Sequence, residues 1–260
     1  MVETALLTLQ AIGYGALTGS AFFIGLFSFW KRMRDEYYDL HQVFDHTFVS
    51  LFWAIVSARL GYIVMQWQFF GFDVVKWVSL SSVPGFIGAV GLTVGLIVFA
   101  RRVARAKWNL FDVLDMMTMP LMIGIILFVL ANALAGVRPG MPTTLPWGVV
   151  YPGTLEARHP VQLYLFGLLL LGSFLLAKVE REYRTYFWYR VNRRTAQPGF
   201  VITCLLIVLG CAHLAVAPFS QSHLLVSGVA IEYILAPLVL SLGASLIWVR
   251  SGRGLPFAGK

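Results

Sequence analysis

The sequence predicts an all-α, polytopic membrane protein with seven transmembrane helices. Hydrophobic residues make up 58% of the 260 residues and charged residues only 12%, a composition suited to lipid rather than water. Apolar windows of about 20 residues, the length needed to cross a bilayer, recur along the whole chain. No segment between them is long enough to fold alone, so a single transmembrane domain, residues 1–260, is expected.

Each expected span is an apolar window that ends at polar or Gly/Pro-rich residues. The first window opens with MVETALLTLQAIGYG, which has neither a basic start nor an evident cleavage site, so it is expected to be a retained helix and not a signal peptide. The spans are expected near residues 5–30, 46–68, 82–100, 110–135, 161–177, 199–218 and 223–249, with an outer loop at 136–160.

Lysine and arginine are distributed unequally between the two sides of the membrane. Clusters follow the first, third, fifth and seventh spans, and the other basic residues are Arg59, Lys76, Arg138 and Arg158. Because cytoplasmic loops hold an excess of both residue types, the N-terminus is expected outside and the C-terminus in the cytoplasm. The net charge of +8 therefore reflects topology and not binding to nucleic acid. The connection at 178–199 is a topology signal or, alternatively, an amphipathic segment on the anionic inner surface.

Cysteine and histidine positions exclude several kinds of site. Cys204 and Cys211 lie about 10 Å apart along one helix, too far to pair, and no function is expected for them. The histidines and cysteines lack the spacing of zinc or iron ligands, so neither a metal nor another cofactor is expected. The absence of an internal repeat in the sequence argues against an inverted-repeat transporter.

Five polar residues inside the expected spans are candidate functional residues, because such side chains are costly in hydrocarbon unless paired or hydrated. Counted at 1.5 Å per residue, all five fall in the outer half of the bilayer, where they are expected to converge on one cavity. They are Tyr14, Arg59, Asn132, His213 and Glu232.

Each of the five also has a structural interpretation. Arg59 can extend to the outer headgroups, and Glu232 can neutralise Arg59 or His213. His213 can be a neutral interior histidine, Asn132 can join two helices by a hydrogen bond, and Tyr14 can belong to an interfacial aromatic belt.

The outer loop contains PTTLPWGVVYPGTLEARHPVQLY at residues 142–164. Its prolines and glycines predict a rigid, turn-rich lid. Arg158 and His159 precede Pro160 at an expected helix start, where two cations suit a phosphate group. The alternative is a capped helix with an interfacial arginine.

These residues resemble the prolipoprotein diacylglyceryl transferases. GMPTTLPWGVVYP and RHPVQLY are similar to that family's Gly-Arg-Pro-Thr-x-x-Pro-Trp-Gly and Arg-His-Pro-Ser-Gln-Leu-Tyr-Glu stretches. ARLGY at 58–62 and IGYG around Tyr14 fit its second and first spans. The resemblance covers essentially the whole chain, and implies transfer of the diacylglyceryl group of phosphatidylglycerol onto the lipobox cysteine of a prolipoprotein.

The chain departs from the family pattern mostly by losing charge. Its counterpart of Gly-Arg-x-Gly-Asn-Phe-x-Asn-Gly-Glu is FVLANALAGV at 128–137, which keeps Asn132 and Gly136. Gly-Arg at the loop becomes Gly140-Met141, and Arg-Phe-x-x-Glu keeps a basic group at His213. The positions that lose a polar or charged family residue are Val83, Val129, Ala135, Val137, Met141, Leu165 and Ala217.

The resemblance implies a transferase in lipoprotein biosynthesis, in the bacterial cytoplasmic (inner) membrane, acting on phosphatidylglycerol and prolipoprotein. Its expected catalytic residues are His213, Asn132 and Tyr14, with His213 accepting the thiol proton because imidazole titrates near neutral pH. The expected substrate-binding residues are Arg59, Arg138, Gly140, Arg158, His159 and Glu232. The alternative is a catalytically inactive homologue that binds lipid or serves as a subunit of a membrane complex, with a channel or transporter as a third hypothesis.

Overall fold

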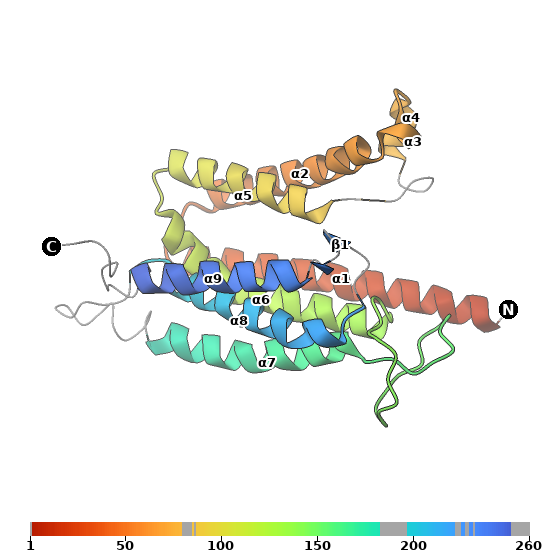
Figure 1. Ribbon diagram of the computed structural model, residues 1–260. Helices are drawn as coiled ribbons and strands as arrows, with labels where there is room; N and C mark the ends of the chain where they lie inside the picture. Colours follow the sequence, from red (N-terminus) through yellow and green to blue (C-terminus); the bar gives the residue numbers. More distant parts are fainter. Residues whose placement is uncertain are drawn as a thin grey trace. The chain divides into compact units, whose positions relative to one another are not determined.

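The structure, a computed structural model, describes residues 2–79, 85, 87–182, 197–221, 225–226, 229–230 and 232–250. Helices make up most of the described chain (Figure 1). They are α1 (Val2–Asp35), α2 (Leu40–Met65), α3 (Trp67–Phe70), α4 (Val74–Val78), α5 (Gly88–Arg105), α6 (Leu110–Leu134), α7 (Val161–Glu180), α8 (Phe200–Val216) and α9 (Glu232–Arg250), with the 3-10 helix η2 (Ala217–Phe219) and the strands β1 (Leu225–Val226) and β2 (Val229–Ala230).

Five helices in the described part of the chain are long and apolar enough to cross a membrane. These segments are Ile12–Asp35, Leu40–Met65, Leu110–Leu134, Val161–Glu180 and Phe200–Phe219, and a shorter apolar helix covers Tyr233–Val249. The predicted class, a helical membrane protein, is therefore confirmed. Crossing by all seven predicted spans and the orientation of the termini remain predictions.

The chain divides into two compact units, one made of Met1–Phe29 with Leu114–Lys260 and the other of Trp30–Val113. In the second unit, α2 and α5 lie side by side and antiparallel. A Cβ atom at Gly91 of α5 would lie 2.6 Å from the carbonyl oxygen of Ala54 on α2, and one at Gly95 would lie 2.9 Å from the Cβ of Ala54. Small residues thus permit close backbone contact, as is common between membrane helices.

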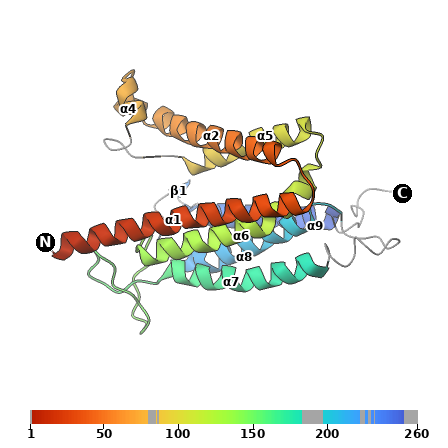
Figure 2. The ribbon, with the colours of Figure 1, turned by 180° about the vertical axis from the view of Figure 1, so that it is seen from behind.

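In the first unit α6, α7 and α8 lie side by side (Figure 2), and buried apolar side chains of the three helices form one core. The core side chains face one another across the three helices, and α9 packs on α8 where Gly210 approaches the backbone of Leu240. The core residues are Met122, Ile126, Val129, Val161, Leu165, Leu169, Leu176, Leu205, Ala212 and Val216.

Asp115 links α6 to the start of α8. Its carboxylate is 7% exposed and accepts hydrogen bonds from the backbone N–H groups of Gly199, at 2.7 Å, and Ile202, at 2.9 Å. A carboxylate at this position satisfies donors that a helix leaves unpaired at its N-terminus and complements the helix dipole. The contact fixes where α8 begins.

The seventh predicted span, 223–249, does not begin as a helix. β1 and β2 pair as antiparallel strands, with Leu225 opposite Ala230 and Val226 opposite Val229. The β-branched side chains of the two valines favour extended backbone over helix, which is consistent with the interruption. α9 begins at Glu232, so the prediction that this residue lies about nine residues inside a helix is wrong.

Candidate functional site

The loop at 136–160, between α6 and α7, folds back on itself and is tied to the end of α8. The backbone N–H of Gly140 donates to the carbonyl of His159 at 3.0 Å, and the N–H of Met141 donates to that of Phe219 at 2.9 Å. Val149 and Arg158 exchange a pair of backbone hydrogen bonds, each 2.9 Å long. These bonds support the predicted rigid character of the loop.

Gly140 occupies a position with no room for a side chain. A Cβ atom there would lie 2.6 Å from three atoms: the carbonyl oxygens of His159 and Phe219 and a methyl group of Val161. Van der Waals contact between such atoms requires a clearly longer distance. Glycine is therefore required at this position because three backbone segments meet there.

Arg158 holds the loop and the segment after α8 together. Its Nη1 donates to the carbonyl of Gly140 at 3.2 Å and to the side chain of Gln221. Its Nε is buried and has no hydrogen-bond partner in the structure. An arginine has five N–H donors, so the guanidinium retains capacity to bind an anion.

His159 lies in an aromatic cluster beside Arg158. Its Nδ1 is 3.3 Å from the hydroxyl of Tyr164, and that hydroxyl also accepts a 2.8 Å hydrogen bond from the indole N–H of Trp147. The imidazole ring lies 5.0 Å from the ring of Phe219. Imidazole, indole and phenol groups are thus placed at the start of α7, with polar atoms next to apolar ring surface.

Tyr151 is half-buried in the same loop. Burial, with a smaller contribution from Tyr164, raises the pKa of its hydroxyl above the ordinary value. The hydroxyl therefore stays protonated at neutral pH and remains a hydrogen-bond donor.

Asn132 lies in the last turn of α6, where its side chain is 8% exposed. Within the described part of the chain, its carboxamide forms no hydrogen bond with another side chain or with the backbone. A carboxamide offers both N–H donors and an acceptor oxygen, so the position suits a group that binds a polar ligand.

His213 lies in the last turn of α8 with an exposed side chain. Its Nδ1 is 2.9 Å from the carbonyl oxygen of Leu209, and a carbonyl can only accept a hydrogen bond. This contact assigns the proton of the neutral ring to Nδ1, so Nε2 carries the lone pair that can accept a proton.

Arg59, in the second unit, is surrounded by backbone carbonyls. The side chain is 8% exposed, and its guanidinium lies 5.3 Å from the ring of Phe70 and 5.9 Å from that of Tyr62. Its nitrogens donate to the carbonyls of Trp77 (2.9 Å), Ser79 (3.0 Å), Gly85 (3.0 Å) and Lys76 (3.2 Å). Arg59 thus joins α2 to the last turn of α4 and to the carbonyls of Ser79 and Gly85.

The remaining predicted site residues are less constrained. Tyr14 is half-exposed on α1, and Arg138 is exposed, with a φ of 56° in the turn after α6. The side chain of Glu232 lies outside the described residues. The structure brings Gly140, Arg158 and His159 together, whereas no hydrogen bond or ion pair among the described side chains joins Tyr14, Asn132 and His213.

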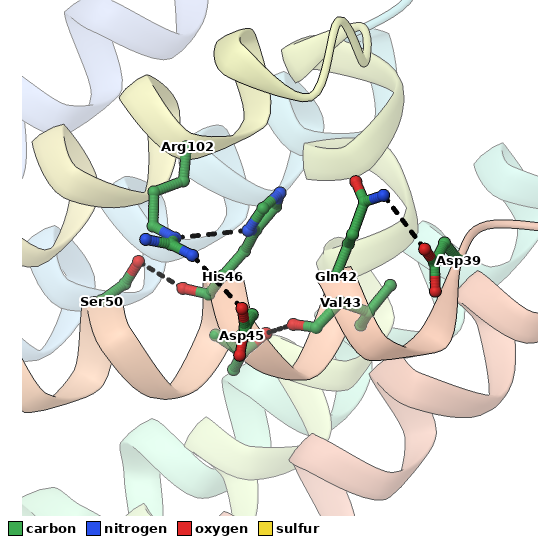
Figure 3. Close-up of polar contacts among 8 residues, drawn as sticks. Asp39, Gln42, Val43, Asp45, His46, Ser50 and Arg102 are labelled. Atoms are coloured by element: carbon green, nitrogen blue, oxygen red, sulfur yellow. Dashed lines mark hydrogen bonds and ion pairs between the residues drawn. The ribbon is translucent and has the colours of Figure 1, made fainter.

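A second polar cluster, between α2 and α5, is not apparent from the sequence. Figure 3 shows Arg102 of α5 pointing toward α2, where its Nε donates to Nδ1 of His46 at 3.3 Å and its Nη2 lies 3.6 Å from the carboxylate of Asp45. Trp108 covers the imidazole, with ring centres 5.0 Å apart. Arg102 belongs to a basic cluster that the sequence identifies only as a topology signal, and its partners lie too far away along the chain to be recognised.

The comparisons with known proteins identify the family. The sequence model of the prolipoprotein diacylglyceryl transferase family matches residues 3–249, nearly the whole chain. The chain belongs to this family. Its relatives include proteins named phosphatidylglycerol–prolipoprotein diacylglyceryl transferase from Sinorhizobium medicae, 30% identical over 76% of this chain and 70% of that protein, and from Aeromonas salmonicida, 26% identical over 82% and 75%. A relative of the same name from Coxiella burnetii is 30% identical over 74% of this chain and 69% of its own.

Family membership gives the apolar replacements a structural context. Val129 and Leu165, at positions where the family pattern has arginine and glutamate, are 5% and 6% exposed and belong to the same apolar core. Val137, at another glutamate position, is 37% exposed. In this chain both positions are therefore apolar and lie in one buried region, where a charge without a partner would be costly.

Proposed function

We propose that this protein is a phosphatidylglycerol–prolipoprotein diacylglyceryl transferase. In the proposed reaction, the thiolate sulfur of a lipobox cysteine attacks the glyceryl carbon that carries the phosphate. A C–S bond forms, the C–O bond to phosphate breaks, and glycerol phosphate leaves with the electron pair. The products are a thioether-linked diacylglyceryl prolipoprotein and glycerol phosphate, and the thiol proton passes to a base on the protein.

The observation that carries this proposal is the family match over residues 3–249. Relatives that align with about three quarters of this chain are named for this transfer reaction. The alternative, a non-catalytic lipid-binding protein or structural subunit, rests on the apolar replacements alone, and none of the comparisons favours it.

His213 is the proposed proton acceptor. Donation from Nδ1 to the carbonyl of Leu209 leaves Nε2 as the basic nitrogen. An imidazole fixed in one tautomer is the arrangement that general-base catalysis requires.

The proposed headgroup site combines cations with neutral hydrogen-bonding groups. Arg158 supplies positive charge and His159 supplies a ring nitrogen, beside Gly140 and next to the start of α7, where a phosphate is favoured. Asn132 and Tyr14 supply hydrogen bonds to the glycerol or the thiol, with Asn132 favoured because its carboxamide forms no hydrogen bond within the described part of the chain. Arg59, Arg138 and Glu232 complete the proposed substrate-binding set, Arg59 by holding backbone carbonyls in place.

We also propose the membrane arrangement that this chemistry needs. Seven spans form a single transmembrane domain in the bacterial cytoplasmic membrane, with the N-terminus outside and the C-terminus in the cytoplasm. This places the loop at 136–160 on the outer side, where an exported prolipoprotein is presented. The positions of the Lys and Arg clusters support this orientation.

The test is the rate of diacylglyceryl transfer in variants of α8. His213→Ala is expected to lower kcat by about 10²–10⁴-fold, the usual contribution of a general base. The matched control is Cys211→Ala, an exposed position two residues away that should retain wild-type turnover. Gel filtration and thermal unfolding in detergent establish that both variants are folded. Unchanged turnover in His213→Ala would remove His213 from the mechanism.

A further inference from the structure

An apolar groove runs along the surface between α7 and α8. It has a volume of about 520 Å³ and is lined by Leu163, Gly167 and Leu171 of α7, by Ala215 of α8 and by Phe219 of η2. The α7 residues are four apart and therefore form one stripe along the helix. The stripe from 163 to 171 is about 12 Å long at 1.5 Å per residue, close to half of the roughly 30 Å hydrocarbon core.

The groove ends at the aromatic cluster of the outer loop. Tyr164 and Phe219 line the groove, and both rings also contact the ring of His159, at 6.1 and 5.0 Å between centres. Arg158 adjoins His159, and its buried Nε has no hydrogen-bond partner in the structure. The apolar groove thus leads to a cluster that contains a cation and several hydrogen-bond donors.

This combination fits an amphipathic, anionic ligand. The groove lies between two helices that are long and apolar enough to cross a membrane, and its lining is almost entirely apolar. An extended peptide there would leave its backbone groups without partners. An acyl chain has no such groups, and the cationic end of the groove complements a lipid phosphate.

Gly167 shows that the groove is open at its centre. A Cβ atom on Gly167 would have no atom within 4 Å, whereas one on Gly172, further along α7, would clash with the side chain of Val208. A side chain at 167 would therefore occupy the groove without displacing a neighbour.

We propose that this groove binds one acyl chain of phosphatidylglycerol, with the phosphate held by His159 and Arg158 at the outer end. The proposal rests on the proposed function for the identity of the lipid. It adds a lipid-binding surface on α7 and α8, from which the headgroup reaches the folded outer loop.

Photo-crosslinking tests the groove directly. The full-length protein is placed in phosphatidylcholine nanodiscs that contain a little phosphatidylglycerol with a diazirine in one acyl chain, and labelled peptides are mapped. Labelling is expected at 163–171 and 215–219, about tenfold above that from a phosphatidylcholine probe with identical chains. The choline cation of that probe cancels the negative charge that Arg158 complements, and one charge-assisted contact is worth about that much. His159→Ala should remove most of this preference.

Gly167→Leu should reduce groove labelling several-fold. The matched control is Gly19→Leu on α1, where a Cβ atom likewise has no atom within 4 Å, and labelling should be unchanged. Leu171→Trp, at a side chain 64% exposed, blocks the groove in the same way should Gly167→Leu fail to fold.

Three outcomes would overturn the proposal. Equal labelling by both probes would indicate contact with surrounding bilayer lipid only. Labelling that the blocking variants leave unchanged, or no labelling of the groove at all, would show that no acyl chain binds there. Transfer activity is measured separately on the same samples. Transfer without groove labelling would reject the groove alone, and labelling without transfer would reject the proposed function alone.

Discussion

At the scale of single residues, burial separates the apolar replacements into two kinds. Val129 lies in the core of α6, α7 and α8, whereas Val137 lies in the turn after α6 with its side chain partly exposed. The family pattern has a charged residue at both positions. Introducing a charged residue should therefore change the stability of the protein differently at the two positions.

Val129→Arg is expected to destabilise the protein by about 3–5 kcal/mol, because an uncompensated charge would be buried among apolar side chains. Val137→Glu should stay within about 0.5 kcal/mol of the parent, as is usual for surface positions. Thermal or denaturant unfolding in detergent gives both values. A Val129→Arg protein as stable as the parent would show that the side chain reaches a polar cavity.

Arg59 illustrates what a sequence reveals about one residue. An arginine inside an apolar span is unusual enough to be recognised from the sequence, and in the structure its side chain is buried. Its contacts are not predictable, because they are backbone carbonyls of Trp77, Ser79 and Gly85, 18 to 26 residues later in the chain. Asp115, which caps α8 from 84 residues away, escapes prediction for the same reason.

At the scale of helices, close packing depends on small residues. A Cβ atom on Gly91 would lie 2.6 Å from the carbonyl oxygen of Ala54 and 2.8 Å from the Cβ of Ala58, both on α2. A Cβ atom on Gly88, at the start of α5, would have no atom within 4 Å. Gly88 and Gly91 of α5 thus differ: a side chain fits at Gly88 but not at Gly91.

Gly91→Leu is expected to separate α2 from α5 and lower the stability of this pair by about 1–3 kcal/mol, the usual cost of overpacking. Gly88→Leu is the matched control and should fold normally. Thermal unfolding in detergent measures both variants, and equal stability of Gly91→Leu and Gly88→Leu would argue against close packing at Gly91.

Helix positions are predictable where apolar windows are long and uninterrupted. The prediction of 110–135 agrees closely with α6 at Leu110–Leu134, and 161–177 with α7 at Val161–Glu180. The prediction of 223–249 is wrong at its start. Leu225, Val226, Val229 and Ala230 form paired strands, and their apolar side chains suit a strand as well as a membrane helix. Composition alone does not distinguish these states over short segments.

At the scale of the whole molecule, the number of spans is the open structural prediction. Three exposed positions separate the possibilities: Tyr37 between α1 and α2, Ala104 near the end of α5, and Leu155 in the outer loop. If α2, α5 and α6 all cross, the first two lie on the cytoplasmic side and the third outside.

Single cysteines at these positions, in a background without Cys204 and Cys211, are tested in intact cells with a membrane-impermeant maleimide. Leu155→Cys should be labelled, whereas Tyr37→Cys and Ala104→Cys should be labelled only after the cells are opened. Labelling of Ala104→Cys but not Tyr37→Cys in intact cells would mean that α5 does not cross, and would exclude seven spans.

The proposed function requires this chain to catalyse diacylglyceryl transfer although Val129 and Leu165 lie in an apolar core. The most direct measurement is transfer of labelled diacylglyceryl from phosphatidylglycerol to a lipobox peptide by the purified protein, beside an authentic transferase as positive control. We predict a thioether-linked product and a stoichiometric release of glycerol phosphate. Folded protein that yields neither product, while the control does, would contradict the claim.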